Sequence, residues 1–345
     1  MRDPGLFLKE FGIAAAIGAT LLIGISWWFL GRKTKRTFPL PSKWRPVGTV
    51  SSLRVYPVKS CKGVEAQKLL VGPAALSKDL NVDRQFMIVD EAGQLVSART
   101  HPKSVLINAE IIEEGLLRLT APDMPPLELN FPSNASNTPE CRGIEMDCVI
   151  HGRPVKAMDM GNAVSQWLTE FLVFRTDRPA ELRLEVRLVF HHLPAGQRRN
   201  LARALLHLPF ASEDDKSMFH DEIGAAHIIS DASLEDLNDH LKGTGTSVSA
   251  LNFRPNITIS GGLPYAEDDW LFVKIGEAVL RTVRPCTRCI MTTVDPQKGE
   301  KNENKEPLAS LRKYRTVEDE TMNKFFNYAP KLVFLGCPEP SSVND

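Results

Sequence analysis

The most informative stretch of this sequence is LFVKIGEAVLRTVRPCTRCIMTTVD, residues 271–295. Its first half holds two apolar runs that meet at Gly276-Glu277, a pair typical of the turn in a β-hairpin. Two cysteines with arginines nearby follow, Cys286 and Cys289, and the run IMTTVD after them is again rich in β-branched residues. The stretch therefore predicts antiparallel strands with two thiols at a strand end.

The rest of the chain from Gly48 onward has the same strand-rich character. Short apolar runs separated by Gly, Pro, Asn and Asp are VSSLRVYPV, QFMIVD, SVLINAEII, LLRLTA, LELNF, IEMDCVIHG, VKAMDM, LEVRLVF and PNITIS. Helical spacing of apolar residues occurs in NAVSQWLTEFL, in a segment from about Ser233 that Ser230 or Asp231 would cap, and in PLASLRKYR. The expected strands do not alternate regularly with helices, yet some helices are expected among them. This pattern predicts a strand-rich α+β fold with barrel-like antiparallel sheets.

The composition argues against several classes of protein. The 42 Lys and Arg residues balance the 42 Asp and Glu residues, so a surface that coats nucleic acid is not expected. Neither GxGxxG nor GxxxxGK[ST] occurs, and a nicotinamide or nucleoside triphosphate site of the usual kind is therefore unsupported. Six cysteines in 345 residues are too few and too irregularly spaced for a disulfide scaffold, which favours a reducing compartment.

An uncharged segment near the N-terminus, Gly12 to Leu30, has the length of a membrane span. At about 1.5 Å per residue a helix over it covers roughly 28 Å, the thickness of a bilayer core. A cleaved secretory signal fits less well because the positive charges follow the apolar segment, and a buried core helix fits less well because several prolines then detach it from the body. The span is followed at once by Arg32, Lys33, Lys35 and Arg36, which predicts that the body faces the cytosol.

The cysteine pair allows three interpretations. A structural zinc site needs four ligands, and the only other near pair, Cys141 and Cys148, has six residues between its members instead of the usual short spacing. A thioredoxin-like dithiol needs a helix after its first cysteine, whereas a β-like run follows here. The third interpretation is two buried free thiols at a strand end, with arginines on the surface.

Three other short segments suit the binding of an anion. The turn YPVKSCKG, residues 56–63, offers two lysines and a hydroxyl, Asp83-Arg84 leads into a strand, and NFRPN places Arg254 at the start of another. Taken singly, Lys59 or Arg254 is more often a solvated or salt-bridged surface residue.

Together these segments resemble the family of mitochondrial amidoxime-reducing components, molybdenum enzymes of the MOSC-domain class. The resemblance runs from about Val47 to about Tyr328 and is carried by YPVKSCKG, DRQF, QWLTEFL, SDASLEDLN, NFRPNI, YAEDDW, CTRCI and TTVDP. It implies a membrane anchor with basic flank (1–36, span about 12–30), a linker (37–47), an N-terminal MOSC-associated β domain (48–175), a MOSC-type β-barrel-like domain (176–336) and an atypical tail (337–345).

The resemblance also implies a cofactor site. Cys289 would be the protein thiolate on molybdenum, beside two dithiolene sulfurs of the pterin and oxo groups, and Cys286 would not be a ligand. The residues that would hold molybdopterin and its terminal phosphate, or line the same pocket, are Lys59, Ser60, Arg84, Arg254, Thr287 and Arg288. Arginine forks and hydroxyls are groups that satisfy phosphate oxygens.

The activity implied is reduction of N-hydroxylated compounds, such as amidoximes and hydroxylamines, to amidines and amines. Electrons would come from NADH through cytochrome b5 reductase and cytochrome b5, which agrees with the lack of a nicotinamide motif. The implied location is the mitochondrial outer membrane, crossed once, with the catalytic body facing the cytosol and no nucleic acid as partner.

One segment departs from the family pattern. Where members close with a further strand pair, this chain continues as LVFLGCPEPSSVND, so a missing closing strand and an exposed barrel edge are expected. This motivates an alternative function, a membrane-tethered molybdopterin-binding protein with little or no turnover. A structural zinc protein is the third hypothesis.

Overall fold

The computed structural model describes residues 38–72, 75–131, 144–175, 184–191, 199–200, 216–217, 226–318 and 320–338. The predicted membrane span, 12–30, lies outside these ranges, and so does Cys141. Among the residues that are described, no helix combines the length and the apolar character needed to cross a bilayer. The described residues from Leu40 onward belong to one compact unit.

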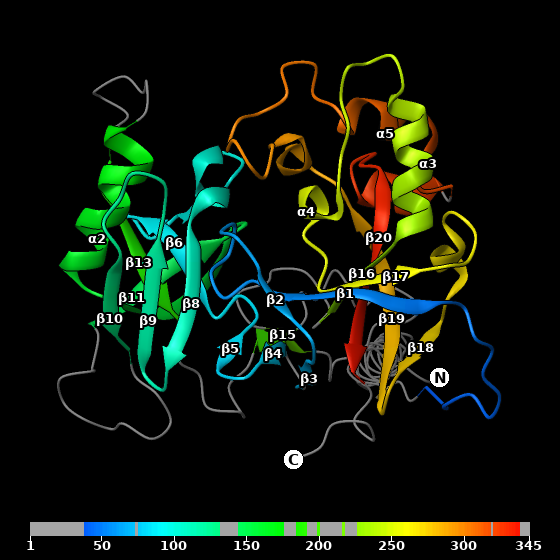
Figure 1. The fold of residues 1–345 in the computed structure, drawn as a ribbon, viewed down its shortest axis with the longest axis horizontal. Helices are drawn as coiled ribbons and strands as arrows, with labels where there is room; N and C mark the ends of the chain where they lie inside the picture. The colour runs from blue at the N-terminus through cyan, green and yellow to red at the C-terminus, as the bar shows by residue number, and fades with distance from the viewer. Residues whose placement is uncertain are drawn as a thin grey trace, which may run out of the picture. The chain divides into compact units, whose positions relative to one another are not determined.

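A seven-stranded sheet forms the half of this unit that contains the cysteine pair (Figure 1). In spatial order its strands are β18 (Phe272–Ile275), β19 (Ala278–Thr287), β20 (Lys331–Pro338), β16 (Ala226–Ser230), β17 (Ile257–Ser260), β1 (Thr49–Val55) and β2 (Val64–Ala66). Neighbouring strands are antiparallel, except that β16 and β17 are parallel. The first strand of the body, β1, thus pairs with a strand more than 200 residues away, which brings the turn after β1 close to Arg254.

The other half is built on two smaller antiparallel sheets. One has the order β11 (Ile144–Ile150), β12 (Arg153–Asp159), β13 (Val186–Phe190), β6 (Phe86–Asp90) and β7 (Leu95–Val96), and the other β10 (Leu127–Asn130), β9 (Leu116–Thr120) and β8 (Asn108–Glu113). Short strands complete the described part: β3 (Leu70–Val71), β4 (Leu76–Lys78), β5 (Asn81–Val82), β14 (Arg199–Asn200) and β15 (Lys216–Ser217). The strand-rich α+β class is therefore confirmed.

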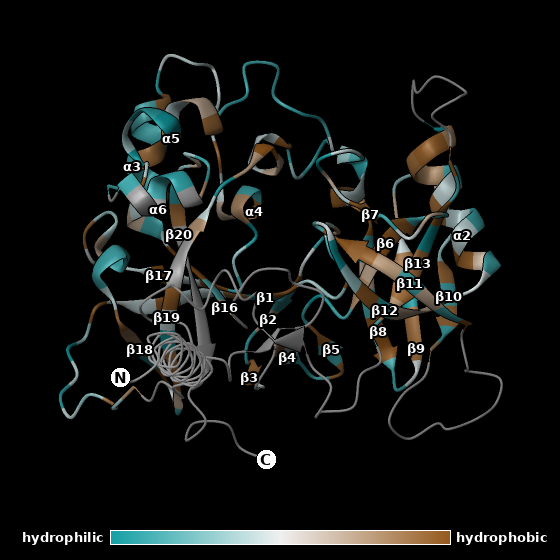
Figure 2. Ribbon diagram, turned by 180° about the vertical axis from the view of Figure 1, so that it is seen from behind, coloured by the Kyte–Doolittle hydropathy of each residue, from teal (hydrophilic) through white to brown (hydrophobic). Residues whose placement is uncertain are grey.

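The core of this second half is aromatic. Phe86, Phe131 and Phe190 come from three segments, and their ring centroids lie 5.0 to 5.3 Å apart. Figure 2 shows hydrophobic residues concentrated on β6, β8 and β9. The predicted helix in NAVSQWLTEFL is confirmed as α2 (Asn162–Thr169), which continues as a π-helix (Glu170–Phe174) and buries its apolar face in this core.

The other predicted helices and the hairpin are confirmed. Helix α3 (Asp231–Leu241) begins after Ser230, whose hydroxyl accepts a hydrogen bond from Ser233 N at 3.1 Å. Strands β18 and β19 pair from Ile275 to Ala278, and Gly276 has the positive φ of 58° that the turn between them requires. The predicted helix in PLASLRKYR is α5 (Leu308–Tyr314). The described residues also form α4 (Ala250–Phe253), α6 (Glu320–Phe325) and the 3-10 turns Pro102–Leu106, Ala266–Asp269 and Ile290–Thr293.

The expectation of a strand after Cys289 is wrong. The segment IMTTVD forms a 3-10 turn, η8 (Ile290–Thr293), with Cys289 as its N-cap. The hydroxyls of Thr292 and Thr293 donate to the carbonyl oxygens of Cys289 and Ile290, at 3.0 and 2.8 Å. These local side-chain bonds support the turn and outweigh the β-propensity of threonine.

The expectation of a missing closing strand is also wrong for residues 331–338. This segment forms β20, which pairs with β16 on one side and β19 on the other. Its proline, Pro338, is the last residue of the strand, where the lack of an N–H interrupts no further pairing. Residues 339–345 lie outside the described ranges.

A buried carboxylate joins the turn Ala266–Asp269 to the start of α3. Glu267 is 1% exposed, and its oxygens lie 2.7 Å from Ser233 Oγ and 3.0 Å from Ser230 Oγ. Hydrogen bonds to a buried charged group stabilise the folded state more than bonds between neutral groups do. Removing the carboxylate takes this acceptor away from the buried hydroxyls of Ser230 and Ser233.

We therefore expect Glu267→Ala to lower the free energy of unfolding by about 3 kcal/mol, measured by urea denaturation. The matched control is Glu277→Ala in the exposed hairpin turn, which should change it by less than about 0.5 kcal/mol. Equal effects of the two substitutions would contradict this role of Glu267.

Candidate functional site

The turn that follows β1 lies against the segment 83–86. Arg84 N donates to Tyr56 O at 2.7 Å, and Lys59 N donates to Phe86 O at 2.8 Å. Ser60 is 3% exposed, and Lys59 is half-buried. The backbone thus brings together three predicted site residues, Lys59, Ser60 and Arg84, from two segments of the sequence.

Three of the predicted site residues have left-handed backbone conformations. The φ angles are 73° at Ser60, 50° at Arg84 and 57° at Arg254. For a residue other than glycine this conformation costs about 1 to 2 kcal/mol, and it persists where surrounding interactions fix it. Such residues are found more often at ligand-binding sites than elsewhere.

The ring of Tyr56 contacts two arginines that are 170 residues apart in sequence. The guanidinium carbons of Arg84 and Arg254 lie over this ring, 4.6 and 4.2 Å from its centroid. The two guanidinium carbons therefore lie at most 8.8 Å from each other. Arg84 also donates from Nη2 to Arg254 O at 3.2 Å. Arg84 and Arg254 therefore contact the same ring, while the convergence of their side chains on one ligand stays a prediction.

The two arginines differ in how their charge is balanced. Arg84 donates from Nη1 to the buried carboxylate of Asp83 and to Asn256 Oδ1. Arg254 is half-buried, and its Nη2 atom is buried without a hydrogen-bond partner among the residues that the structure describes. Desolvation lowers the pKa of Arg254 to about 10, so the side chain remains a cation at neutral pH.

A cavity of about 180 Å³ opens beside Arg254. It is lined by residues from the first turn and from the α4 and η8 segments, Arg54, Tyr56, Lys62, Gly63, Glu65, Val105, Leu251, Asn252, Arg254, Met291, Val294 and Pro296. Three of these are cations, and only Glu65 is acidic, paired with Arg54 at 3.2 Å. A guanidinium with a buried, unsatisfied N–H beside such a cavity fits an anionic ligand.

The two cysteines of the pair lie in different environments. Cys286 is 4% exposed in a core cluster, and its sulfur accepts from Arg288 Nη1 at 3.0 Å. Cys289 is partly exposed, whereas Cys61, Cys148 and Cys286 are buried, among the cysteines whose side chains are described. Burial raises the pKa of the Cys61 thiol to about 12, which leaves that thiol unreactive. Cys289 is therefore the accessible thiol of the described set.

Arg288 links the strand end to Arg254. Strand β19 ends at Thr287, and Arg288 then donates from Nη2 to Phe253 O at 3.1 Å, next to Arg254 in sequence. The 3-10 turn that begins at Cys289 contacts the same region, because Asn252 Nδ2 donates to Val294 O at 3.2 Å. Arg288 and the turn after Cys289 therefore lie near Arg254. Thr287, Arg288 and Cys289 are not among the residues that line the cavity.

Sequence reasoning missed His227. Its Nε2 lies 3.2 Å from Arg288 Nη1, and its Nδ1 lies 3.2 Å from Arg254 O. A guanidinium only donates, so Nε2 accepts and the Nδ1–H donates to the carbonyl, which fixes the neutral tautomer in this arrangement. The ring thus connects the two arginines, and no feature of the strand sequence AHIIS indicated it.

The zinc interpretation of the cysteines receives no support from the described residues. Within the described ranges, no three His, Cys, Asp or Glu side chains gather in a way that could hold a metal ion. Cys148 lies on β11, in a core cluster with Met87 and Val89, whereas Cys286 belongs to another cluster.

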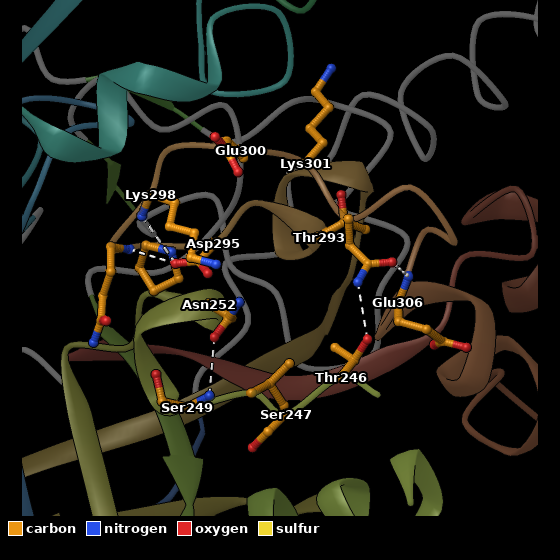
Figure 3. Close-up of a pocket in the computed structure, with 14 residues that line it drawn as sticks. Thr246, Ser247, Ser249, Asn252, Thr293, Asp295, Lys298, Glu300, Lys301 and Glu306 are labelled. Carbon is orange, nitrogen blue, oxygen red and sulfur yellow. Dashed lines mark hydrogen bonds between the residues drawn. The ribbon is translucent and has the colours of Figure 1, made fainter. Parts of the chain in front are cut away.

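A second, larger cavity of about 400 Å³ lies beside η8 (Figure 3). Its walls are polar and carry both signs of charge, and the side chains of Thr246, Ser249, Asn252, Thr293, Asp295, Lys298, Glu300, Lys301 and Glu306 are among those that line it. Asn252 and Pro296 line this cavity and the smaller one. Asn252 is held in place because its Oδ1 accepts from Ser249 N at 3.0 Å.

This chain is similar to known proteins over most of its length. Residues 47–175 match the MOSC N-terminal beta barrel domain, and residues 214–327 match the MOSC domain. Mitochondrial amidoxime-reducing component 1 of Mus musculus is 34% identical, over 92% of this chain and 85% of the relative. The human proteins are similar, with 35% identity to component 1 (92% of this chain, 85% of the relative) and 32% to component 2 (90% and 84%). The chain therefore belongs to the MOSC-domain family that includes the mitochondrial amidoxime-reducing components.

Proposed function

We propose that this protein is a molybdenum-cofactor-dependent oxidoreductase that reduces N-hydroxylated compounds, such as amidoximes and hydroxylamines, to amidines and amines. The names of its relatives describe the reduction of amidoximes, and the chain covers more than four fifths of their length. The structural observation that carries the proposal is Arg254, a half-buried cation that lines a cavity and whose buried Nη2 atom has no partner among the described residues.

The residues fit the anionic end of molybdopterin. Arg84 and Arg254 lie over one ring, and a phosphate group is the kind of ligand that satisfies guanidinium N–H groups through charge-assisted hydrogen bonds. Lys59 and Ser60 belong to the adjacent turn and would add an ammonium and a hydroxyl. Thr287 and Arg288 would hold the pterin on the side of β19. The three left-handed residues support a ligand-binding role for these segments.

Cys289 would hold the molybdenum. It is the partly exposed member of the pair, while Cys286 is buried and its sulfur accepts from Arg288. The metal centre would supply the two-electron reduction, and soft thiolate is a suitable ligand for it. The protein would supply binding and orientation: Arg84 and Arg254 hold the anionic end, and the polar cavity beside η8 is the candidate entrance for a small polar substrate.

The remaining assignments extend the proposal beyond the described residues. Electrons would come from NADH through cytochrome b5 reductase and cytochrome b5. Residues 12–30 would anchor the protein in the mitochondrial outer membrane, with the MOSC-associated domain at 48–175 and the MOSC domain at 176–336. We do not favour the alternative, a tethered cofactor-binding protein without turnover, because it rested on a missing closing strand and β20 supplies a strand there.

The first prediction concerns the metal ligand. Cys289→Ser should abolish N-reduction, whereas Cys286→Ser should keep much of it, since a single thiolate holds the metal and Cys286 is enclosed in the core. The measurement is the rate of amidoxime reduction, normalised to molybdopterin content, with cytochrome b5 and its reductase as electron donors. Equal losses in the two variants would point to a dithiol or zinc mechanism instead.

The second prediction concerns Arg254. Arg254→Ala should weaken cofactor affinity about tenfold or more, because one charge-assisted contact is worth roughly 1.5 to 3 kcal/mol. Arg254→Lys should recover only part, since an ammonium lacks the planar fork. Bound pterin is measured by fluorescence after oxidation of the desalted protein. Arg118→Ala on β9, half-exposed and paired with Glu128, is the control, and full occupancy in Arg254→Ala would remove Arg254 from the site.

The third prediction concerns topology. Protease added to intact mitochondria should digest the body of the protein, because the basic residues after the predicted span resist translocation. A protein of the intermembrane space serves as the control for membrane integrity. Protection of the body until the outer membrane is ruptured would refute the cytosolic orientation.

A further inference from the structure

We propose that Tyr56 is a positioning residue whose ring orients the guanidinium groups of Arg84 and Arg254 toward one anionic ligand. This inference rests on the proposed function only in identifying that anion as the phosphate-bearing end of molybdopterin. Tyr56 acts through the two arginines, because its hydroxyl is already used: it donates to Pro255 O at 3.2 Å.

The ring itself is held rigidly. Tyr56 is 1% exposed, its N–H donates to Asp83 Oδ1 at 2.8 Å, and its hydroxyl is fixed on Pro255. Burial raises the pKa of the Tyr56 hydroxyl, which therefore stays neutral and keeps donating at physiological pH. The hydrogen bonds at its backbone and at its hydroxyl fix the position of the Tyr56 ring. They therefore also fix the ring face that the two arginines contact.

Two cations that lie close together, Arg84 buried and Arg254 half-buried, need such an organiser. The charge of Arg84 disfavours the charged form of Arg254. Arg84 forms an ion pair with the carboxylate of Asp83, whereas Arg254 forms no ion pair with the residues that the structure describes. An aromatic face carries the negative part of the ring quadrupole, and it attracts a guanidinium that lies over it. The ring thus offsets part of the repulsion between the two guanidinium groups and keeps both of them ordered in the absence of ligand. This preorganisation raises the affinity for an anionic ligand.

Gly63 supplies an independent way to disturb the ring. A Cβ built at Gly63 would lie 2.5 Å from Tyr56 Cε1, closer than real Cβ contacts allow. The φ of Gly63 is not positive, so the requirement for glycine here comes from the ring and not from the backbone. Gly63→Ala should therefore displace a chemically unchanged ring.

The test compares Tyr56→Phe, which keeps the ring, with Tyr56→Leu, which removes it. In the full chain, Tyr56→Leu should weaken pterin retention about tenfold, since two cation–π contacts are lost, and Tyr56→Phe should retain pterin within about twofold of the unmodified protein. Gly63→Ala should fall between them. Melting temperatures are measured in parallel, because a purely structural role would make retention follow stability in all variants instead of following the presence of the ring.

A second probe separates this inference from the proposed function. Inorganic phosphate is titrated into the full chain produced without molybdenum cofactor, and its apparent Kd is read from the rise in melting temperature, with chloride at equal ionic strength as the control. We expect Tyr56→Leu to weaken phosphate about tenfold and Tyr56→Phe to leave it nearly unchanged.

Each outcome then decides one question. If the chain retains no pterin even when it is produced with cofactor, and its phosphate binding still depends on the ring, the positioning role stands and the cofactor assignment is overturned. Unchanged retention and phosphate affinity in Tyr56→Leu, or an equal loss in Tyr56→Phe, would overturn the positioning role. If Tyr56→Leu does not fold, Gly63→Ala decides: affinities equal to those of the unmodified protein would refute the inference.

Discussion

The carboxylate of Asp83 is the interaction on which the site depends. It is 0% exposed, and it accepts hydrogen bonds from Tyr56 N at 2.8 Å, from Asn256 Nδ2 at 2.9 Å and from Arg84. A buried carboxylate is tolerated when its charge is paired and its lone pairs are satisfied, and these donors do both. These three donors come from three segments of the sequence. The carboxylate of Asp83 therefore holds the turn after β1, the start of β6 and the start of β17 close together.

Asn256 carries the same connection into the larger sheet. Its Oδ1 accepts from Arg84 Nη1 and from the backbone N–H of His227, and its Nδ2 also donates to Arg54 O. Asn256 lies two residues after Arg254, whose left-handed backbone turns the chain from α4 into β17. The position of Arg254 is thus a consequence of this buried polar network, and the ring of Tyr56 fits between groups that the network has already fixed.

The features that sequence predicted well are the local ones. Gly276-Glu277 marks a turn because the flanking residues pair directly, and Ser230 caps α3 because the cap bond spans three residues. Sequence failed where a local pattern was ambiguous or the deciding partner was distant. Thr292 and Thr293 have high β-propensity, but their hydroxyls bond to carbonyl groups of their own turn. Strand β20 depends on partners 44 to 110 residues earlier in the sequence. The site residues were expected from a family resemblance, whereas nothing local to His227 revealed that it joins Arg254 to Arg288.

The place of β20 in the sheet bears on how the protein is made. β16 and β19 each pair with β20, so β18 and β19 on one side are joined to β16, β17, β1 and β2 on the other through a strand that is synthesised last among them. While the chain emerges from the ribosome, both groups of strands present unpaired edges, and such edges associate readily with other chains. Completion of the sheet must wait until residues 331–338 have been made, so a chain interrupted just before Lys331 would leave the facing edges of β16 and β19 unpaired and exposed to other chains.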